Sequence, residues 1–574
     1  MSKTPNFDKK INDLLSETQA GEKTDSLTGE NWRMTEREIT LFRDFNVPPL
    51  KTSPETFVKK FLPLMTAYSW WWNKHAETGK PLLTYIHPHT KYKIISDDEW
   101  HARDFSLIHQ DLFIEHSFFN QLFNLATSVP LSAYKNVEKP VNSIARISLG
   151  DEDSYFVEGC QSKRCFYCTD SFNIEDSAEV CWSDHVNNSY NVLRSHNISG
   201  CRVVRESREC LSSLFIFDCR NCEFCFMSWN QRNKKYLFRN EQLTPEEWHR
   251  RLAEIDFGDF DVFDKYYQEF FAKLNSETIW PENFNDKCQN STGEYLEKTL
   301  NCERSWYCDG AKNSYFGLWD NFGSENNALG CHPGSSHCYG NAAAFNCQNC
   351  LFNYFAIRCQ NCEYCIECYD CENCFGCVGL KRKKFCILNK QYSEDEYWKV
   401  LDELKCVMLD RGEYGKSLPL KFSLTPFSSS SFDLGFSQSE KTSEQLEAFD
   451  FEPSLDGAFG DWTNKTFYQI ENLPKKIDEI NDEWLGRAII STDYQRPFTI
   501  LKPELAFYKK LRLPARREHF IKRIEEMWKT LNKLEQEEKF CLRCQKKITV
   551  AKNTAYPQRK IFCRECYLSY LETK

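Results

Sequence analysis

The chain has 574 residues, more than one hydrophobic core usually organises, so we expect three or four domains. Apolar residues make up 41% and aromatic residues 15% of the sequence, and this content excludes disorder of the whole chain. The formal net charge is −10, but residues 501–574 contain 19 Lys and Arg against 9 Asp and Glu, so a basic segment follows an acidic body.

The N-terminal residues 1–30 are hydrophilic and predict a flexible tail. They contain no apolar core of the signal-peptide type, and no part of the chain has the roughly 18–20 consecutive apolar residues that a membrane span requires. The sequence therefore predicts a cytoplasmic protein without membrane attachment. In a reducing compartment its 29 cysteines are expected to be metal ligands or small core residues, not disulfides.

Residues 31–135 predict a degenerate zinc-ribbon-like module with helices, related to the C-terminal end of the chain. Thr35–Pro48 aligns with Leu501–Pro514, and His75 stands close to where the C-terminal copy has Cys541. Because the cysteines are absent, we expect an aromatic core to hold this module without metal. A histidine site is the alternative, with His75, His87 and His89 as its candidate ligands.

The most informative feature is a period of twelve residues. When residues 136–255 are written in rows of twelve from Gly159, small or apolar residues fill three columns almost throughout. The seventh column reads Cys165, Ser177, Ser189, Cys201, Ser213 and Cys225. This stretch predicts a first solenoid of cysteine- and serine-rich repeats with a capping helix.

A second block, residues 286–408, repeats the pattern with more cysteine. Its fourth column runs Cys302, Ser314, Asn326, Cys338, Cys350, Cys362, Cys374 and Cys386. Its third column is mostly Asn, at Asn301, Asn313, Asn349, Asn361 and Asn373. We interpret both blocks as β-solenoids, in which equivalent residues stack about 4.8 Å apart around a narrow interior. Asparagines at one corner are expected to hydrogen-bond to their neighbours above and below.

Each block is followed by the signature of a helix start. Thr244 with Glu247, and Ser393 with Glu396, have the spacing of a capping box, which predicts a helix after each block. Residues 256–285 connect the blocks, and Val262–Leu274 predicts an amphipathic helix rich in aromatic residues.

The dense cysteines of the second block offer a weaker metal candidate. Cys359, Cys362, Cys371 and Cys374 form two C-x-x-C pairs on adjacent rows, a pattern that suits zinc or an iron–sulfur cluster. We favour the alternative, a ladder of reduced thiols that pack as small apolar side chains. The same columns accept Ser, Ile and Val elsewhere, and a ligand set does not tolerate such replacement.

Residues 409–470 predict a Ser-rich linker, and residues 471–574 a basic module with a Cys₄ zinc ribbon. Cys541-x-x-Cys544 and Cys563-x-x-Cys566 are separated by eighteen residues, which is typical of a tetrahedral site. Four thiolates leave no open coordination position, so we expect one structural Zn²⁺. The expected fold class is multidomain α+β: two β-solenoid blocks with helical caps between zinc-ribbon-like modules, the C-terminal one metal-bound.

With these parts, the chain resembles an uncharacterised cysteine-rich zinc-ribbon/β-solenoid family of candidate phyla radiation bacteria, sometimes labelled caib/baif family. The residues that carry the resemblance are Phe507–Pro514, the four cysteines of Cys541–Cys566, Phe217–Cys225 and Asn373–Tyr397. The resemblance implies an architecture and a metal but no reaction. Family members carry further cysteine pairs, and the equivalents here, at Ser26–Gly29, Ser53–Pro54 and Ser491–Asp493, lack them, which argues against more than one zinc per chain.

The function we expect is that of a binding or scaffold module for an unknown protein partner. Solenoids present long faces, and the exposed columns here carry aromatic residues of the types enriched at interfaces.

Two other classes of function remain open. The alternative is a nucleic-acid- or ribosome-associated factor, with Arg516, Arg517, Lys522 and Arg523 as phosphate contacts. An enzyme is less expected, because the candidates form no recognisable catalytic set; they are Asp170, Glu175, Asp184, His185 and Asp320.

Overall fold

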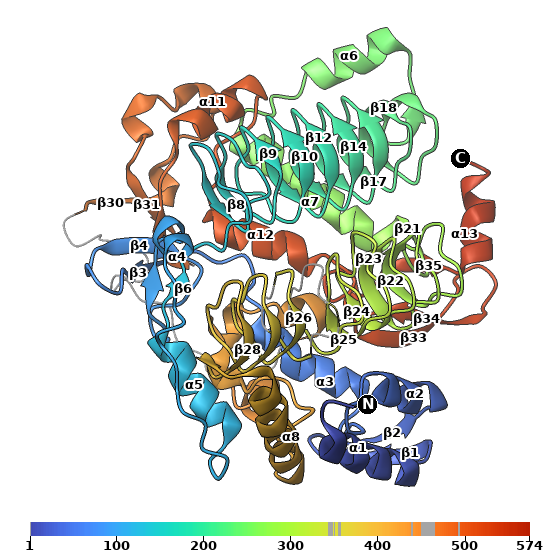
Figure 1. The fold of residues 1–574 in the computed structure, drawn as a ribbon. Helices are drawn as coiled ribbons and strands as arrows, with labels where there is room; N and C mark the ends of the chain where they lie inside the picture. The colour runs from blue at the N-terminus through green and yellow to red at the C-terminus, as the bar shows by residue number, and fades with distance from the viewer. Residues whose placement is uncertain are drawn as a thin grey trace.

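The computed structural model describes residues 2–341, 348, 351–353, 357–437, 440–448, 465–491 and 494–574. Its architecture is mixed α/β: curled parallel sheets form the centre, and helices and small antiparallel hairpins lie around them (Figure 1). None of the helices in these ranges is long and apolar enough to cross a membrane. The 27 cysteines that the structure describes are all free thiols.

A curled parallel sheet of twelve strands forms the first block. Except for the last strand, which is antiparallel to its neighbour, its strands pair with strands twelve residues further along, so that Phe172 lies opposite Asp184 and Asp184 opposite His196. A short parallel pair, β7 (Ile144–Arg146) and β8 (Tyr155–Glu158), precedes it. The strands of the sheet are β9 (Ser162–Lys163), β10 (Phe172–Glu175), β11 (Ala178–Cys181), β12 (Asp184–Asn187), β13 (Tyr190–Leu193), β14 (His196–Ser199), β15 (Arg202–Arg205), β16 (Arg208–Leu211), β17 (Leu214–Phe217), β18 (Glu223–Trp229), β19 (Lys235–Phe238) and β20 (Glu241–Gln242).

The backbone of this block turns at every third residue. From Arg164 to Arg239 each third residue has a positive φ angle, and with the exception of Gly200 all of them carry side chains. Asn and Asp tolerate this left-handed conformation best and occupy many of these positions. The residue that follows each turn points inward, as Val180 and Val186 do, and these residues form a continuous buried core.

Serine and cysteine alternate in the interior because both can bond to the next backbone turn. The Ser189 hydroxyl donates to the Asn187 carbonyl (2.7 Å) and accepts from the Cys201 N–H (3.1 Å). One turn later the Cys201 thiol accepts from the Ser213 N–H at 3.4 Å. The exchange of Ser for Cys in this column therefore preserves a hydrogen bond that a buried N–H needs.

The second block contains two further parallel sheets. Cys362 lies opposite Cys374, and Cys374 opposite Cys386, so its cysteines stack. The asparagine ladder is confirmed: the side chain of Asn301 donates to Asn313 (3.1 Å), and that of Asn361 to Asn373 (3.1 Å). The strands are β22 (Gly293–Glu297), β23 (Ser305–Asp309), β24 (Tyr315–Leu318), β25 (Ala328–Cys331), β26 (Gln360–Glu363), β27 (Glu372–Phe375), β28 (Lys384–Ile387) and β29 (Lys390–Gln391). Asn349 and Cys350 lie outside the described residues.

The helices expected after each block are present. Thr244 accepts from the Glu247 N–H at the start of α6 (Pro245–Ala253), and Ser393 with Glu396 completes a capping box at the start of α8 (Glu394–Asp410). The connecting helix, α7, spans Phe260–Ser276 and is followed by β21 (Ile279–Pro281).

The first thirty residues differ from the flexible tail that we expected. Helix α1 (Pro5–Glu17) buries Phe7, Ile11 and Leu15, whose four-residue spacing places them on one face. The Asp402 carboxylate of α8 accepts from the Phe7 N–H (2.8 Å) and so satisfies the helix start. The elements that follow are β1 (Gly21–Thr24), β2 (Asn31–Met34), α2 (Glu36–Asp44), α3 (Pro54–Phe61), η1 (Leu62–Leu64), β3 (Trp71–Lys74), β4 (Pro81–Thr84), β5 (Ile94–Ile95), α4 (Asp97–Ala102), α5 (Phe118–Ser128) and β6 (Leu131–Ser132).

The described part of residues 409–470 is more ordered than a linker, because its phenylalanines are buried in the core, at Phe422, Phe427, Phe432 and Phe436. Residues 438–439 and 449–464 of this segment lie outside the described ranges. The remaining elements are η2 (Leu420–Phe422), η3 (Phe427–Ser429), α9 (Phe432–Gly435), α10 (Glu440–Gln445), β30 (Phe467–Gln469), η4 (Ile470–Asn472), η5 (Ile477–Glu479), η6 (Asp482–Trp484), β31 (Ala488–Ser491), β32 (Tyr494–Phe498), α11 (Lys502–Lys510), α12 (Phe520–Lys529), β33 (Gln536–Phe540), β34 (Lys547–Ala551), β35 (Lys560–Phe562) and α13 (Arg564–Leu571).

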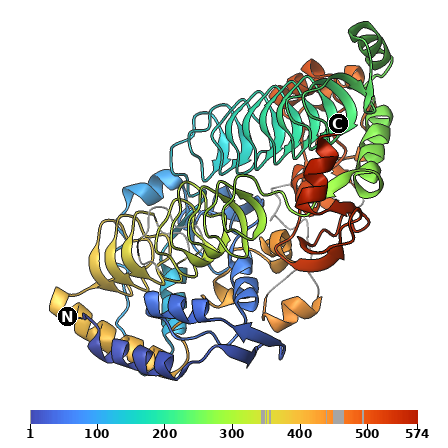
Figure 2. The ribbon, with the colours of Figure 1, turned by 90° about the vertical axis from the view of Figure 1, so that its right-hand side faces the viewer.

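The two blocks lie side by side, with C-terminal segments packed between them (Figures 1 and 2). Trp182 of the first block contacts Trp306 of the second, with ring centroids 5.5 Å apart, and stacks on Trp528 of α12 at 5.9 Å. The blocks therefore share a core although they are far apart in the sequence.

Candidate metal centre

The C-terminal Cys₄ module, residues 536–571, begins with the antiparallel hairpin of β33 and β34. Cys541 directly follows the first strand, and its N–H donates to the Lys546 carbonyl (2.9 Å) across a tight turn. The Gln545 N–H donates back to the Cys541 carbonyl (2.9 Å), and Gln545 has a φ of 61°. This turn brings Cys541 and Cys544 to the same side of the hairpin.

The second cysteine pair stands at the start of a helix. Cys563 is the N-cap of α13, so Cys566 lies in its first turn. The Leu542 N–H donates to the Ile561 carbonyl (2.9 Å) and joins the first turn to β35. The module is anchored to the body of the protein, because β35 pairs with β21 and the Tyr567 hydroxyl bonds to the Asp218 carboxylate.

The four sulfur atoms converge on one point. Those of Cys541, Cys544, Cys563 and Cys566 all lie within 4.8 Å of one another, and those of Cys544 and Cys563 are 3.7 Å apart. No other group of three or more His, Cys, Asp or Glu ligands in the described ranges meets this criterion. The cluster can therefore hold a metal ion, and four protein ligands leave it no position at which to activate water.

Backbone N–H groups stabilise the ionised form of one of the four thiols. Burial acts to raise the pKa of Cys541, but N–H groups of Cys544, Cys563 and Arg543 that point at its sulfur lower that pKa to about 6. Burial and the neighbouring thiols raise the pKa of Cys566 to about 12. A cation is needed for all four thiols to ionise together.

The same backbone frame recurs near the N-terminus with different side chains. The Asp25 N–H donates to the Glu30 carbonyl (2.8 Å), and the Ser26 N–H donates to Lys51 (2.9 Å), as the N–H groups of Cys541 and Leu542 do in the C-terminal module. The Asp25 carboxylate accepts from the backbone N–H groups of Leu27 (2.9 Å), Thr28 (3.1 Å) and Ser53 (2.8 Å). Burial acts to raise the pKa of Asp25, but these bonds outweigh it and hold the pKa below its usual value.

A third copy of the frame contains His75. Its N–H donates to Lys80 (2.9 Å), and the Ala76 N–H donates to Ile94 (2.8 Å). The His75 Nδ1 accepts from the Glu77 and Thr78 N–H groups (3.3 Å each), so Nε2 carries the proton and donates to Glu99 at 2.7 Å. In both N-terminal copies, hydrogen bonds connect the first turn to the start of the following helix, Asp25 to Ser53 and His75 to Glu99. In the Cys₄ module the four cysteines occupy the equivalent places.

Sequence reasoning placed His75 but missed Asp25 and Glu99. A carboxylate that accepts hydrogen bonds from backbone N–H groups has no sequence motif. A polar residue directly after a short strand is the only sequence feature that points to it. The suggested histidine site with His87 and His89 does not form, because the His75 ring is committed to Glu99 and the described residues around it hold no group of three ligands.

The four cysteines of the weaker candidate do not form a metal-binding cluster by the same criterion. Cys359, Cys362, Cys371 and Cys374 are buried in a ladder whose thiols donate to backbone carbonyls. Cys371, for example, lies 3.4 Å from the carbonyl oxygens of both Tyr369 and Leu380. They pack as small side chains.

Three of the four basic residues proposed for nucleic acid face the protein. Arg523 is buried against Glu179, and Arg516 pairs with Glu518 at 3.2 Å. Arg517 donates to the carbonyl of Ile470 (2.8 Å). Lys522 remains partly exposed, 3.9 Å from Glu526. Contact with nucleic acid stays a prediction, and Arg523 cannot contribute to it from its buried position.

The acidic residues considered for catalysis lie in different surroundings. Asp320 is fully buried between Ser314 (2.6 Å) and His332 (3.0 Å), and Glu175 forms a surface ion pair with Arg164. Asp184 and His185 pair with each other at 2.7 Å on the surface. Asp170 lines a cavity between the blocks.

Comparison with known proteins assigns no family to this chain. No family model matches it, and no curated protein matches it. The resemblance to cysteine-rich zinc-ribbon proteins therefore stays a prediction, and function has to be argued from the geometry above.

Proposed function

We propose that this chain is a zinc-binding repeat protein that acts as a protein-interaction scaffold. In this proposal Cys541, Cys544, Cys563 and Cys566 hold one structural Zn²⁺ and the Cys₄ module is a zinc ribbon. Four converging thiolates on two turns are the ligand set that structural zinc prefers.

The observation that carries the scaffold role is the exposure of apolar side chains around the four cysteines. The exposed fractions are 65% for Phe540, 52% for Leu542 and 52% for Leu568. Phe540 lies in β33, Leu542 in the turn between Cys541 and Cys544, and Leu568 in α13. The four cysteines hold these three segments together. Exposed apolar side chains of this kind are typical of protein-binding surfaces.

The same proposal treats both repeat blocks as β-solenoids. Parallel pairing at an offset of twelve residues in the first block, and of eleven to thirteen in the second, supports it, as does the turn at every third residue of the first block. Stacked units of this kind give a rigid body on which a small module can be presented.

The metal part of the proposal is tested by elemental analysis of protein purified under reducing conditions. We expect one zinc and no iron per chain, and no zinc in the Cys544→Ser variant. Hydrogen exchange in residues 536–571 should rise in that variant, because metal binding and folding of such modules are coupled. Cys406→Ser, which alters a cysteine outside the cluster, is the control and should keep its zinc. A second metal per chain would contradict the proposal.

The interaction part is tested with a photo-reactive residue at position 542, compared with one at Leu107, which is 89% exposed but distant in sequence. In cells that express the protein, we expect cross-links from position 542 to one defined protein, abolished by Cys544→Ser. Equal labelling from both positions, or none from 542, would overturn the scaffold role. Cross-links to RNA would favour the nucleic-acid alternative instead.

A further inference from the structure

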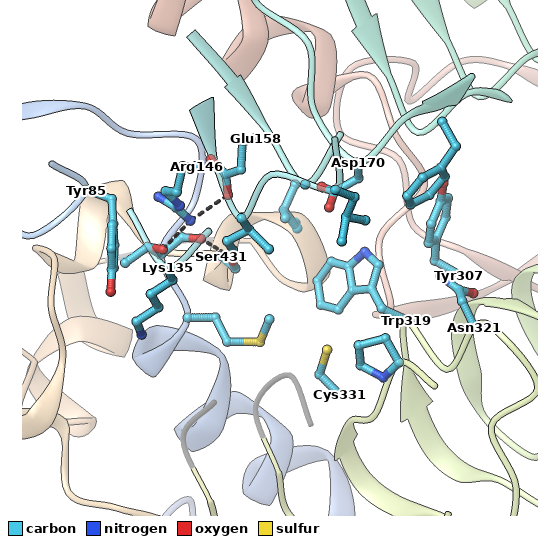
Figure 3. A pocket seen from close by; sticks show the side chains of 18 of the residues that line it. Tyr85, Lys135, Arg146, Glu158, Asp170, Tyr307, Trp319, Asn321, Cys331 and Ser431 are labelled. Atoms are coloured by element: carbon cyan, nitrogen blue, oxygen red, sulfur yellow. Dashed lines mark hydrogen bonds and ion pairs between the residues drawn. The ribbon is translucent and has the colours of Figure 1, made fainter. Parts of the chain in front are cut away.

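A cavity of about 200 Å³ lies between the two blocks (Figure 3). Its walls come from segments far apart in the sequence: the first block, the second block, the segment after α3 and the segment that contains Ser431. Arg146 and Glu158 lie at one end, and Trp319, Tyr307 and Asn321 at the other.

The polar end contains a buried charge that is incompletely bonded. The Arg146 side chain is 3% exposed, and its Nη2 donates to Thr66 (2.7 Å) and to Glu158 Oε1 (2.5 Å). The Nε and Nη1 of Arg146 and the Oε2 of Glu158 have no hydrogen-bond partner among the described residues. Buried N–H groups of a guanidinium are costly to leave unbonded, and they can only donate.

The opposite end is mainly aromatic and also contains Asp170 and Asn321. Trp319, Tyr307 and Trp528 line it together with Phe172 and Phe322, whose rings contact each other edge to face at 5.4 Å. Phe322 is 59% exposed, so it lies at the mouth of the cavity. A second cavity of about 320 Å³ adjoins this end, and the two cavities share Asp170, Phe172, Tyr307, Asn321 and Phe322.

We propose that this cavity is a binding site for a small planar aromatic carboxylate, with the ring against Trp319 and Tyr307 and the carboxylate on Arg146. A flat apolar wall selects a flat ring, and a guanidinium with free N–H groups selects a carboxylate. A volume of about 200 Å³ is below the range of drug-sized pockets, which limits the ligand to one or two fused rings.

Two basic and two acidic residues line the cavity, and they are unevenly placed: Lys135 and Arg146 both lie over the Tyr85 ring at the end proposed for the carboxylate, whereas Asp170 lies near Trp319. Burial raises the pKa of Glu158 to about 8, although Arg146 beside it acts in the opposite direction. A protonated Glu158 also donates a hydrogen bond, so both groups can serve the same acceptor.

The test is calorimetric titration of the full-length, zinc-loaded protein with sodium 2-naphthoate and with its uncharged analogue, naphthalene-2-methanol. We expect one binding site for 2-naphthoate and an affinity for the alcohol at least tenfold lower. Phe322→Ala should weaken 2-naphthoate severalfold without disturbing the fold, because this ring is mostly exposed. Leu211→Ala, which shortens an exposed side chain outside the cavity, is the matched control and should bind normally.

A second variant addresses the polar end. In Arg146→Met/Glu158→Met both members of the buried pair are replaced, which avoids leaving one charge alone. We expect this variant to bind the acid and the alcohol with affinities within threefold of each other. If it does not fold, the comparison of acid and alcohol on the unaltered protein and the Phe322→Ala result decide the matter. Absence of binding at millimolar concentrations, equal affinity for both probes, or no effect of Phe322→Ala would each overturn the proposal.

Discussion

Hydrogen-bonded side chains stand in the two N-terminal copies of the frame where the C-terminal copy has its four cysteines. Asp25 accepts three backbone N–H groups, and His75 bridges to Glu99. The cysteines of the C-terminal copy could be predicted because their spacing is explicit in the sequence. The role of Asp25 could not, since it depends on Ser53, which only the folded chain brings beside it.

Asp151 is a residue whose burial has a consequence for stability. It is 1% exposed, it accepts from the Ser162 hydroxyl, and its Oδ2 has no partner among the described residues. Burial raises its pKa from 3.8 to about 6, against the effect of the serine hydrogen bonds. A carboxyl whose pKa rises on folding binds its proton more tightly in the folded state, so the folded state loses stability as the pH rises from about 4 to about 6.

We therefore expect Asp151→Asn to raise the free energy of unfolding at pH 7.5, by at most about 3 kcal/mol. The difference should shrink to about a third of that value as the pH falls to 4.5. Urea denaturation of both proteins over this range measures it. Asp13→Asn, on an exposed face of α1, is the control variant, and a constant difference for Asp151→Asn would refute the explanation.

At the scale of the element, the twelve-residue period could be predicted from the sequence, but the path of the backbone within each repeat could not. Twelve-residue columns of Ser, Cys and Val indicated which residues face inward, and the asparagine ladder followed from its column. The turn at every third residue left little signal, because Val203 and Phe215 also adopt the left-handed conformation there. Such residues are strained individually, and stacking against the neighbouring segments has to offset that strain.

The serine column makes a prediction about this stacking. In Ser189→Ala the Cys201 N–H loses its acceptor, and a buried N–H without a partner destabilises by about 1–3 kcal/mol. Hydrogen exchange of the Cys201 and Ser213 amides, with the thermal midpoint, measures the loss.

Ser189→Cys is the control for this prediction. A thiol already accepts from the next N–H at Cys201, so the cysteine variant should retain most of the stability. Equal destabilisation by Ala and Cys would show that packing, and not the hydrogen bond, sets the preference of the column.

At the scale of the molecule, the assembly of the parts could not be predicted from the sequence. Helix α1 packs on α8 across almost four hundred residues, and α12 lies against both blocks. These contacts include hydrogen bonds between buried groups far apart in the sequence, such as Phe7 and Asp402, and no local sequence pattern predicts them. The cavity between the blocks is a product of this assembly, since Arg146 and Trp319 meet only when the blocks lie side by side.

The ion pair between Arg523 of α12 and Glu179 of the first block is such a contact. Their side chains are 2% and 0% exposed, and Arg523 also donates to the Tyr508 hydroxyl (3.0 Å). Arg523 also lies 3.9 Å from the buried Glu504, so Arg523→Met leaves two carboxylates without their cation, whereas Glu179→Met leaves the arginine one partner. We expect Arg523→Met to destabilise the protein by about 3–5 kcal/mol and Glu179→Met by less.

The double variant Arg523→Met/Glu179→Met separates charge from packing. With both charges gone the desolvation penalty of the pair is absent, and only Glu504 loses a cation, so we expect its stability to lie within about 1–2 kcal/mol of the parent protein. Denaturation of the four proteins gives the coupling energy directly. If the double variant is as unstable as the sum of the single ones, the pair does not act as a unit. In that case the arginine holds α12 in place through Tyr508 and Tyr167, whose ring lies 4.8 Å from its guanidinium carbon, and the contact between α12 and the first block is aromatic rather than ionic.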